Sequence, residues 1–266
     1  MPTTSTILRR TDSDGVATLT LAAPESRNAL GLLAIDSLIV ALADAEKDPA
    51  IRTVVIAGEG PAFSAGHDLK EVQAHRNDAD GGAAYFEKLM RRCAELMRAI
   101  VDLPKPVIAA IEGVATAAGC QLVAACDLAI AGERARFALP GVNIGLFCST
   151  PLVAVGRAVS RKAAMELALT GEPIDARRAE SLGLVNRVVP AGQALAQAQA
   201  LAAKIAARPA AVTALGKRTF QAQIETSLAD AYRIASDAMI ENLALPEANE
   251  GVAAFLDKRP ARWSDR

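Results

Sequence analysis

A glycine-rich turn at residues 58–70 (GEGPAFSAGHDLK) follows a β-branched run at residues 53–57 (TVVIA). A turn of this kind after a strand presents backbone N–H groups that bind an oxygen carrying or developing negative charge. The segment does not match a dinucleotide-binding fingerprint, because Phe63 stands where the third glycine belongs, and no Gly-Lys-Ser/Thr follows to make a P-loop. Taken alone, the turn is compatible with an anion-binding role and with a purely structural one.

A second segment, residues 108–127 (IAAIEGVATAAGCQLVAACD), leaves a predicted strand, crosses Gly113 and enters a predicted helix. Small side chains at the helix start allow a ligand to approach the backbone closely, and the helix start adds partial positive charge. These small residues are Ala115, Ala117, Ala118 and Gly119. Two N–H groups from two loops, about 3 Å from a developing oxyanion, are worth roughly 2.7–4 kcal/mol each. A close-packed helix without a ligand is the alternative.

The two segments, in this order and separation, resemble those of the crotonase superfamily, also called the enoyl-CoA hydratase/isomerase family. Five stretches carry the resemblance: residues 24–30 (PESRNAL), 63–70 (FSAGHDLK), 105–127, 169–184 (LTGEPIDARRAESLGL) and 251–259 (GVAAFLDKR). The combination of GHDLK with GLFCSTP is similar to one branch, the enoyl-CoA hydratase domain-containing protein 3 type. The resemblance implies an α/β fold built as a spiral of β-β-α turns, trimers or dimers of trimers, and an acyl-CoA ligand.

The resemblance also implies roles for individual residues. Two backbone N–H groups of the family polarise the thioester carbonyl and stabilise an enolate, and by resemblance these are the amides of His67 and Ala118. Lys70 resembles the lysine near the CoA phosphates, and Lys258 resembles a C-terminal lysine that often reaches a neighbouring subunit's ligand. A solvated surface charge is the alternative for either lysine. The remaining residues expected along the CoA path are Arg27, Ala65, Asp68 and Leu69.

Two positions depart from the family pattern. Family hydratases place two glutamates around the substrate double bond, and here those positions hold Gln121 and Gly141. A glutamine hydrogen-bonds water but does not take its proton near pH 7, and a glycine has no side chain. General acid–base groups typically contribute 10²–10⁴-fold each. We therefore expect a conventional hydratase with this sequence to be severely impaired.

Other residues near these positions offer few substitutes. The segment VNIGLFCSTP contains no carboxylate, and its polar side chains are Asn143, Cys148, Ser149 and Thr150. A reactive Cys148 thiolate needs a positive neighbour or a helix N-terminus, so we expect a buried, inert thiol. His67 has a titratable side chain, but its backbone suffices for the oxyanion role. We expect Asp68 to cap a loop or helix rather than to act as a base.

Alternation and periodicity predict the elements that position these residues. Strands are expected at residues 16–22, 53–57, 107–111, 127–131 and 135–139, helices at 32–47 and 85–103, and a surface loop at 77–82. Four further helices are expected at residues 194–207, 210–223, 227–243 and 250–258. This pattern predicts a core at residues 1–190 and a C-terminal helical region at 191–266. Large apolar helix faces there predict an oligomer.

Composition limits the remaining functions. The chain has 266 residues, a formal net charge of −1 and 3% aromatic residues, which disfavours nucleic acid and anionic membranes as partners. His67 and His75 are the only histidines, and we expect neither a metal site nor a resident cofactor; coenzyme A enters as part of the substrate. Four cysteines in a chain of this length, and a start without an apolar signal region, predict a reduced, cytoplasmic protein.

The sequence thus predicts an acyl-CoA-processing protein of fatty acid metabolism that stabilises an enolate or oxyanion. We expect it to be classed as an enoyl-CoA hydratase, in spite of Gln121 and Gly141. Two alternatives stay open: a non-catalytic acyl-CoA binder, and a different acyl-CoA reaction such as decarboxylation or thioester hydrolysis.

Overall fold

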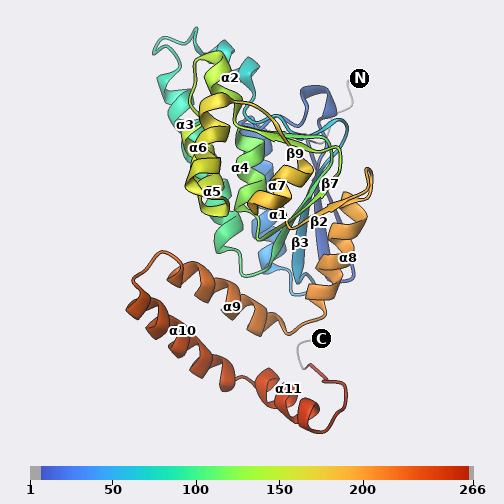
Figure 1. Cartoon of the computed structure of the whole chain (residues 1–266). Coiled ribbons are helices and arrows are strands. Elements are labelled where there is room, and N and C mark those ends of the chain that lie inside the picture. Colours follow the sequence, from blue (N-terminus) through green and yellow to red (C-terminus); the bar gives the residue numbers. More distant parts are fainter. Residues whose placement is uncertain (1–6, 264–266) are drawn as a thin grey trace.

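The larger of two sheets forms the centre of the molecule. The computed structural model describes residues 7–263. The sheet has the strand order β1-β2-β3-β5-β7-β10 (Figure 1). Its strands are β1 (Leu8–Ser13), β2 (Val16–Leu21), β3 (Thr53–Gly58), β5 (Val107–Ile111), β7 (Leu128–Gly132) and β10 (Arg187–Val189). All pairs are parallel except β1 with β2. Every residue of β5 is buried, as expected for a parallel strand covered on both faces.

The smaller sheet continues the spiral. It has the order β4-β6-β8-β9, with β4 (Ala62–Ser64), β6 (Val114–Thr116), β8 (Arg136–Ala138) and β9 (Ile174–Asp175). The passes that begin with β3, β5 and β7 each add one strand to the larger sheet, then one to the smaller sheet, and then one or more helices. Thus β3-β4 leads to α2 (Leu69–His75) and α3 (Ala83–Asp102), and β5-β6 leads to α4 (Ala118–Ala125). This is the predicted spiral of β-β-α turns.

Helices cover both faces of the larger sheet. The main core lies between one face and α1 (Leu32–Lys47), α3 and α4; α1 contributes Ala34, Ile35, Leu38, Leu42 and Ala45 at helical spacing. The other helices of this layer are α5 (Ser149–Ala158), α6 (Arg161–Thr170) and α7 (Ala176–Leu182). The opposite face packs on α8 (Ala194–Ala206), whose Ala194, Ala198 and Ala202 are buried. The alanine-rich α8 is thus part of the core packing.

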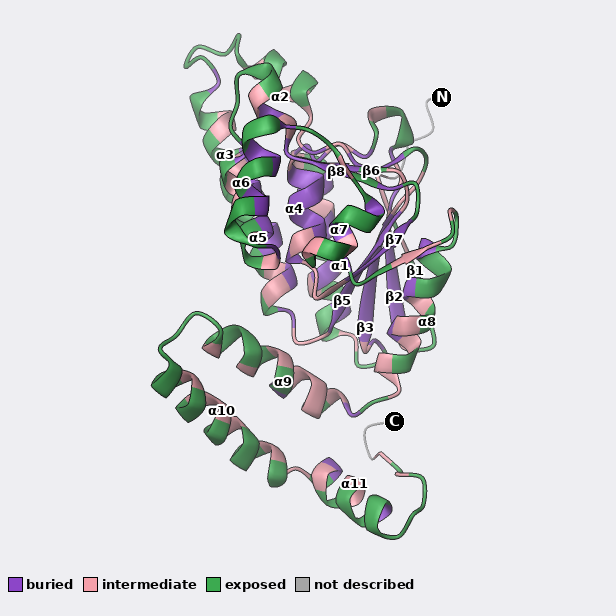
Figure 2. Ribbon diagram, in the orientation of Figure 1, coloured by how far each residue is buried: buried purple, intermediate pink, exposed green. Residues whose placement is uncertain are grey.

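The last three helices project from the core as an arm (Figure 1). They are α9 (Ala210–Gln223), α10 (Leu228–Leu243) and α11 (Pro246–Leu256). α10 contributes no buried residue, and most of the arm is exposed in Figure 2. Its exposed large apolar residues are Phe220, Ile224, Leu228, Tyr232, Met239, Ile240, Leu243, Val252, Phe255 and Leu256. None of the helices within residues 7–263 is long and apolar enough to cross a membrane.

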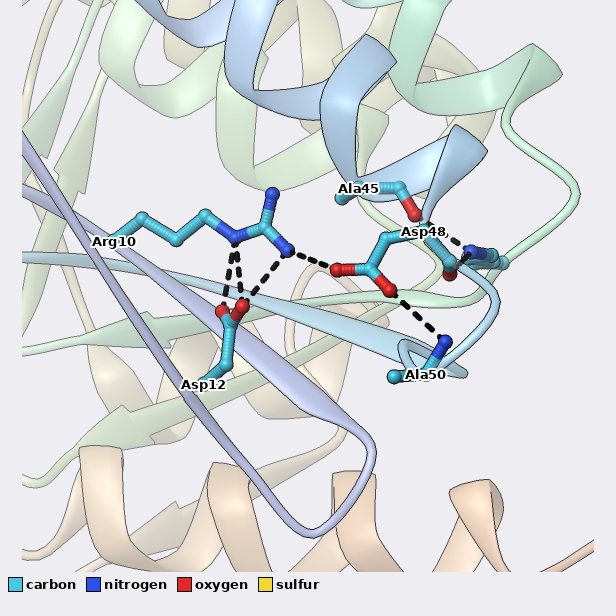
Figure 3. A network of polar contacts seen from close by, with 6 residues as sticks. Arg10, Asp12, Ala45, Asp48 and Ala50 are labelled. Atoms are coloured by element: carbon cyan, nitrogen blue, oxygen red, sulfur yellow. Dashed lines mark hydrogen bonds and ion pairs between the residues drawn. The ribbon is translucent and has the colours of Figure 1, made fainter. Parts of the chain in front are cut away.

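Polar networks hold the ends of the core elements together (Figure 3). Arg10 of β1 donates to Asp48, the residue that ends α1, at 3.1 Å. Asp48 also accepts from the backbone N–H of Ala50, at 2.9 Å. Lys105, before β5, donates from Nζ to the carbonyl oxygens of Ala45 and Asp48 at 2.6 and 2.7 Å. These contacts join the outer strand, the end of α1 and the entry to the central strand.

Ion pairs attach the arm to the core: Arg157 of α5 pairs with Glu225, which follows α9, and Lys217 of α9 pairs with Asp127. The Lys217 side chain is 8% exposed, and its Nζ lies 2.7 Å from Oδ2 of Asp127, the residue directly before β7. The same ammonium group donates to the carbonyl oxygens of Ile100 and Lys105. Asp127 also accepts from the N–H of Val107, so the arm is joined to the first residue of β5. Burial raises the pKa of Asp127, and the Lys217 charge opposes that rise.

Replacing Lys217 by methionine should therefore destabilise the chain. Lys217→Met removes the charge and leaves a largely buried Asp127 without its ion-pair partner, a loss of about 3 kcal/mol in the free energy of unfolding. Lys204→Met, at an exposed position of α8, should change it by no more than about 0.5 kcal/mol. Urea denaturation of the two variants measures the free energy of unfolding, and equal stabilities would contradict the role given to the Lys217–Asp127 ion pair.

Candidate active site

The two predicted oxyanion loops are in direct contact. A Cβ atom placed on Gly66 would lie 2.9 Å from the carbonyl oxygen of Thr116 and 3.1 Å from the amide nitrogen of Ala118. The Thr116 hydroxyl donates to the carbonyl oxygen of Ala65 at 3.2 Å. Gly66 has φ of +88°, a left-handed conformation that glycine adopts without strain. The turn after β4 therefore lies against the start of α4 with no room for a side chain between them.

Strand pairing produces this contact. β4 and β6 are parallel neighbours, with Ser64 opposite Ala115, so the loops that follow the two strands leave the sheet at the same edge. A Cβ on Gly119 would lie 2.3 Å from the carbonyl oxygen of Ser64. Glycine at position 119 thus allows the first turn of α4 to approach β4 backbone to backbone.

Both predicted oxyanion donors have free backbone N–H groups. Among residues 7–263, the amides of His67 and Ala118 donate to no protein acceptor. Ala118 is the first residue of α4, where the unpaired N–H groups of a helix carry partial positive charge. The preceding Ala117 has φ of +50° and ψ of −119°, and its own N–H bonds to Ala138 at 3.0 Å. This unusual backbone conformation is held by β8 immediately before the candidate donor.

The His67 side chain is anchored toward α1. Its Nδ1–H donates to the carbonyl oxygen of Leu30 at 3.1 Å, because a carbonyl only accepts. The N–H of Leu30 donates in turn to the carbonyl oxygen of Gly66 at 2.7 Å. Burial lowers the pKa of His67 below its ordinary value of 6.5, and the Leu30 bond partly opposes this. The imidazole is therefore neutral at physiological pH, and its backbone is fixed from both sides.

A residue that the sequence analysis passed over supports this loop. Asn28 is 1% exposed; its side-chain oxygen accepts from the N–H of Ala23, and its amide nitrogen donates to the carbonyls of Glu59 and Ala62. Arg27, with an exposed side chain, accepts from the N–H of Ala65 through its carbonyl oxygen at 3.0 Å. The only sequence signal for Asn28 is an amide within PESRNAL, directly before an apolar run.

The predicted CoA-path residues fall into two groups. Asp68 is the N-cap of α2, and its Oδ1 accepts from the N–H groups of Lys70 and Glu71 at 2.8 and 3.3 Å, which is the capping role expected of it. Leu69 and Lys70 are exposed on the first turn of α2, next to the candidate donors. Lys258 is exposed and follows α11, and α11 lies at the opposite end of the molecule from α2 (Figure 1). One chain alone does not bring Lys258 to the loops.

The two glutamate positions of the family are both occupied without a carboxylate. Gln121 lies one turn after Ala118 on α4, is 3% exposed, and accepts a hydrogen bond from the thiol of Cys93 at 3.8 Å. Gly141 belongs to the 3-10 helix η2 (Pro140–Ile144). A Cβ at position 141 would lie 3.0 Å from Sγ of Cys148 and 2.9 Å from the carbonyl oxygen of Leu146. Cys148 therefore fills the space that a side chain at position 141 needs.

Cys148 is a buried thiol at the N-cap of α5. Burial raises its pKa, and a backbone hydrogen bond from Gly141 only partly opposes the rise. The thiol is thus protonated at neutral pH despite its place at a helix start, in keeping with the inert role expected. Of the other polar residues in this segment, Asn143 and Ser149 are exposed and Thr150 is half-buried.

Comparison with known proteins identifies relatives over nearly the whole chain. The enoyl-CoA hydratase/isomerase family matches residues 11–266. The enoyl-CoA hydratase domain-containing protein 3 of Mus musculus is 46% identical over 251 residues, which are 94% of this chain and 82% of that protein. An enoyl-CoA hydratase structure from Mycobacterium smegmatis has a TM-score of 0.91 at 49% identity, covering 97% of this chain and 99% of that one. The structure of human enoyl-CoA hydratase domain-containing protein 3 has a TM-score of 0.92 at 43% identity, covering 97% of this chain and 100% of that one. The predicted family, branch and fold are confirmed.

The predicted cytoplasmic location is contradicted by these relatives. The matching proteins from Mus musculus, Rattus norvegicus, Xenopus laevis and Homo sapiens are mitochondrial by name. The prediction rested in part on unpaired cysteines, and all four are free in the structure. Free thiols indicate a reducing environment and do not distinguish one reducing compartment from another, so the cytoplasmic assignment is withdrawn.

The buried, neutral His67 predicts acid-sensitive stability. The pKa of His67 is lower in the folded chain than its ordinary value of 6.5 in the unfolded chain. Between these two pKa values the unfolded chain binds more protons than the folded chain. Stability that is present above pH 6.5 is therefore lost as the pH falls. His67→Asn keeps an N–H donor for Leu30 but does not titrate. The fall in urea midpoint between pH 7.5 and 5.5 should be smaller in this variant than in the wild type.

His75→Asn, at the only other histidine, retains His67, so its urea midpoint should still fall more steeply with acid than that of His67→Asn. An identical pH dependence in wild type and His67→Asn would show that the imidazole is not the group responsible.

Proposed function

Because the chain belongs to the enoyl-CoA hydratase/isomerase family, we propose that it binds an acyl-CoA thioester with the carbonyl oxygen between the amides of His67 and Ala118. The contact of Gly66 with the backbone at residues 116–118 is the observation that carries the proposal, since it holds two unpaired N–H groups on adjoining loops. Donors of this kind stabilise negative charge on the oxygen as an enolate or tetrahedral oxyanion forms. No resident cofactor is part of the proposal.

The CoA moiety would follow the exposed side of the same loop. We propose that Arg27, Ala65, Asp68 and Leu69 line this path and that Lys70 approaches the CoA phosphates. Trimers or dimers of trimers, packed through the apolar residues of α9–α11, would cover side chains such as Phe255 and Leu256, which are 83% and 71% exposed in the single chain. Such an assembly would also give Lys258 a route to a neighbouring subunit's ligand.

The reaction itself is the less conventional part of the proposal. This chain lacks both carboxylates that family hydratases use, and Cys148 occupies the space beside Gly141. We therefore favour chemistry that needs the two N–H groups but not those carboxylates. Decarboxylation, which leaves an electron pair on the α-carbon as an enolate, and thioester hydrolysis through an oxyanion both meet this requirement. Simple binding of an acyl-CoA without conversion is the remaining alternative.

Acetoacetyl-CoA tests the oxyanion site without knowledge of the reaction. This β-ketothioester forms an enolate that absorbs in the near ultraviolet, and binding between the two N–H groups should increase that band. Gly66→Ala places a methyl group against the Ala118 amide and should abolish the increase, as should Ala118→Pro, which removes one donor.

Gly192→Ala is the matched control, because Gly192 has a similar φ of +81° but no atom within 4 Å of the added Cβ. It imposes comparable backbone strain away from the site and should keep the enolate band. A band that persists in folded Gly66→Ala and Ala118→Pro would contradict the assignment of these donors.

Hydration of crotonyl-CoA tests the consequence of the missing carboxylates. Loss of general acid–base groups worth 10²–10⁴-fold each should hold turnover at least about 100-fold below an ordinary rate of about 10 s⁻¹. The measurement is the loss of the enoyl absorbance with purified protein. Turnover near 10 s⁻¹ would show that some other group moves the proton, and a mass-spectrometric screen of acyl-CoAs would register water gained, carbon dioxide lost or CoA released.

A further inference from the structure

One side of the Gln121 amide group, its oxygen, is held by a hydrogen bond from α3. Residues three apart on a helix share a face, and helical side chains lean toward the N-terminus, so the Gln121 amide lies over the turn that begins with Ala118. The thiol of Cys93 on α3 donates to its Oε1 at 3.8 Å. Burial raises the pKa of Cys93 to about 12, so this thiol keeps its proton and remains a donor. The amide oxygen of Gln121 is therefore engaged on the side of α3.

The nitrogen of the same amide is left as a donor without a partner. Among the described residues, the one buried side-chain nitrogen or oxygen that lacks a hydrogen bond is Nε2 of His67. Nε2 of Gln121 donates to no acceptor within residues 7–263, and yet it is not such a buried atom. It therefore reaches accessible space although the whole residue is only 3% exposed. The Gln121 amide thus offers two N–H donors at the position where family hydratases carry a glutamate carboxylate, which is an acceptor.

Three elements near this amide and the first turns of a fourth carry no charged side chain. Residues 114–126 and 137–156 contain no charged side chain, so β6, α4, η2 and the first turns of α5 are neutral. Cys148 stands beside Gly141 as a protonated thiol, because burial raises its pKa. The start of α4 adds partial positive charge. An acidic group on the ligand would meet donors here, whereas two glutamates would repel it.

We infer that Gln121 selects acyl-CoA thioesters whose acyl group carries a carboxylate on the α-carbon, as in malonyl-CoA, by donating from Nε2 to that carboxylate. This inference rests on the proposed function, since the thioester carbonyl must first be held by the amides of His67 and Ala118. With the carbonyl held there, we expect the carboxylate, two bonds away, to lie near the turn of α4 that carries both Ala118 and Gln121. Cys93 is a positioning residue, because it holds the amide with its nitrogen outward.

Binding of two esters of matched shape tests the inference. Malonyl-CoA carries a planar carboxylate on the α-carbon, and 3-methylbutanoyl-CoA carries there an uncharged isopropyl group with the same number of heavy atoms. Calorimetry with the full chain at pH 7.5 should show malonyl-CoA binding at least 10-fold more tightly than the neutral ester. Hydrogen bonds to charged groups are about twice as strong as neutral ones, which supports an effect of this size.

Variants at position 121 should change this preference selectively. Gln121→Glu, nearly identical in shape, should weaken malonyl-CoA at least 10-fold and leave 3-methylbutanoyl-CoA within about threefold. Gln121→Met, which introduces no charge, should remove the preference without reversing it, and it decides the matter if the glutamate variant does not fold. Cys93→Ala, which frees the amide to turn, should reduce the preference while the neutral ester binds as before.

Two results overturn the inference and are distinguishable from failure of the proposed function. Equal affinities of the two esters for the wild type, or a preference for malonyl-CoA that persists in Gln121→Glu and Gln121→Met, would remove Gln121 as the selecting residue and leave the oxyanion site intact. Failure of both esters to bind the wild type would overturn the oxyanion site as well. Gly66→Ala, which disturbs the carbonyl site, should weaken both esters alike.

Discussion

The close approach of two backbone segments, the turn at Gly66 and the start of α4 at Ala118, is the contact on which the candidate site depends. It requires glycine at positions 66 and 119, because a Cβ at either would collide with backbone atoms of the facing segment. It also requires β4 and β6 to be parallel neighbours, so that both loops leave the sheet at one edge. The spiral of β-β-α turns provides this pairing, and Asn28, Leu30 and Ala138 hold the loops from outside. The sheets thus place two unpaired N–H groups on adjoining loops.

A different set of contacts surrounds the two positions at which family hydratases carry glutamates, and in both a cysteine thiol is the neighbour. Cys148 packs against Gly141 and leaves no room there for a longer side chain, while Cys93 holds the amide oxygen of Gln121. Burial raises the pKa of both thiols, so neither adds negative charge at these positions. The two substitutions relative to the hydratase pattern are therefore accommodated by packing. Under the proposed function, a site with these donors and without the two carboxylates would favour acidic ligands that the glutamates of family hydratases would repel.

Much of the fold is predictable from the sequence, because its core elements have clear periodicity. The helices at 32–47 and 210–223 and the strand at 107–111 match α1, α9 and β5 at both ends. Residues 8–13 and 69–75 were not predicted, since the first is a mostly exposed edge strand and the second is a short helix marked only by its Asp68 cap. The helix expected from residue 250 begins at Pro246, which serves as its first residue. In the site, the donor loops were predictable from the motif, whereas the Cys93–Gln121 bond joins residues 28 positions apart and has no local signal.

The central claim is that two backbone N–H groups hold a thioester carbonyl, and the vibration of that carbonyl reports on it most directly. Difference infrared spectra of butanoyl-CoA, unlabelled and ¹³C-labelled at the thioester carbon, would isolate the C=O stretch of the bound ligand. Two hydrogen bonds from His67 and Ala118 weaken the double bond, so the stretch should shift to lower frequency on binding. A bound ester whose carbonyl stretch stays at its value in water would contradict the account.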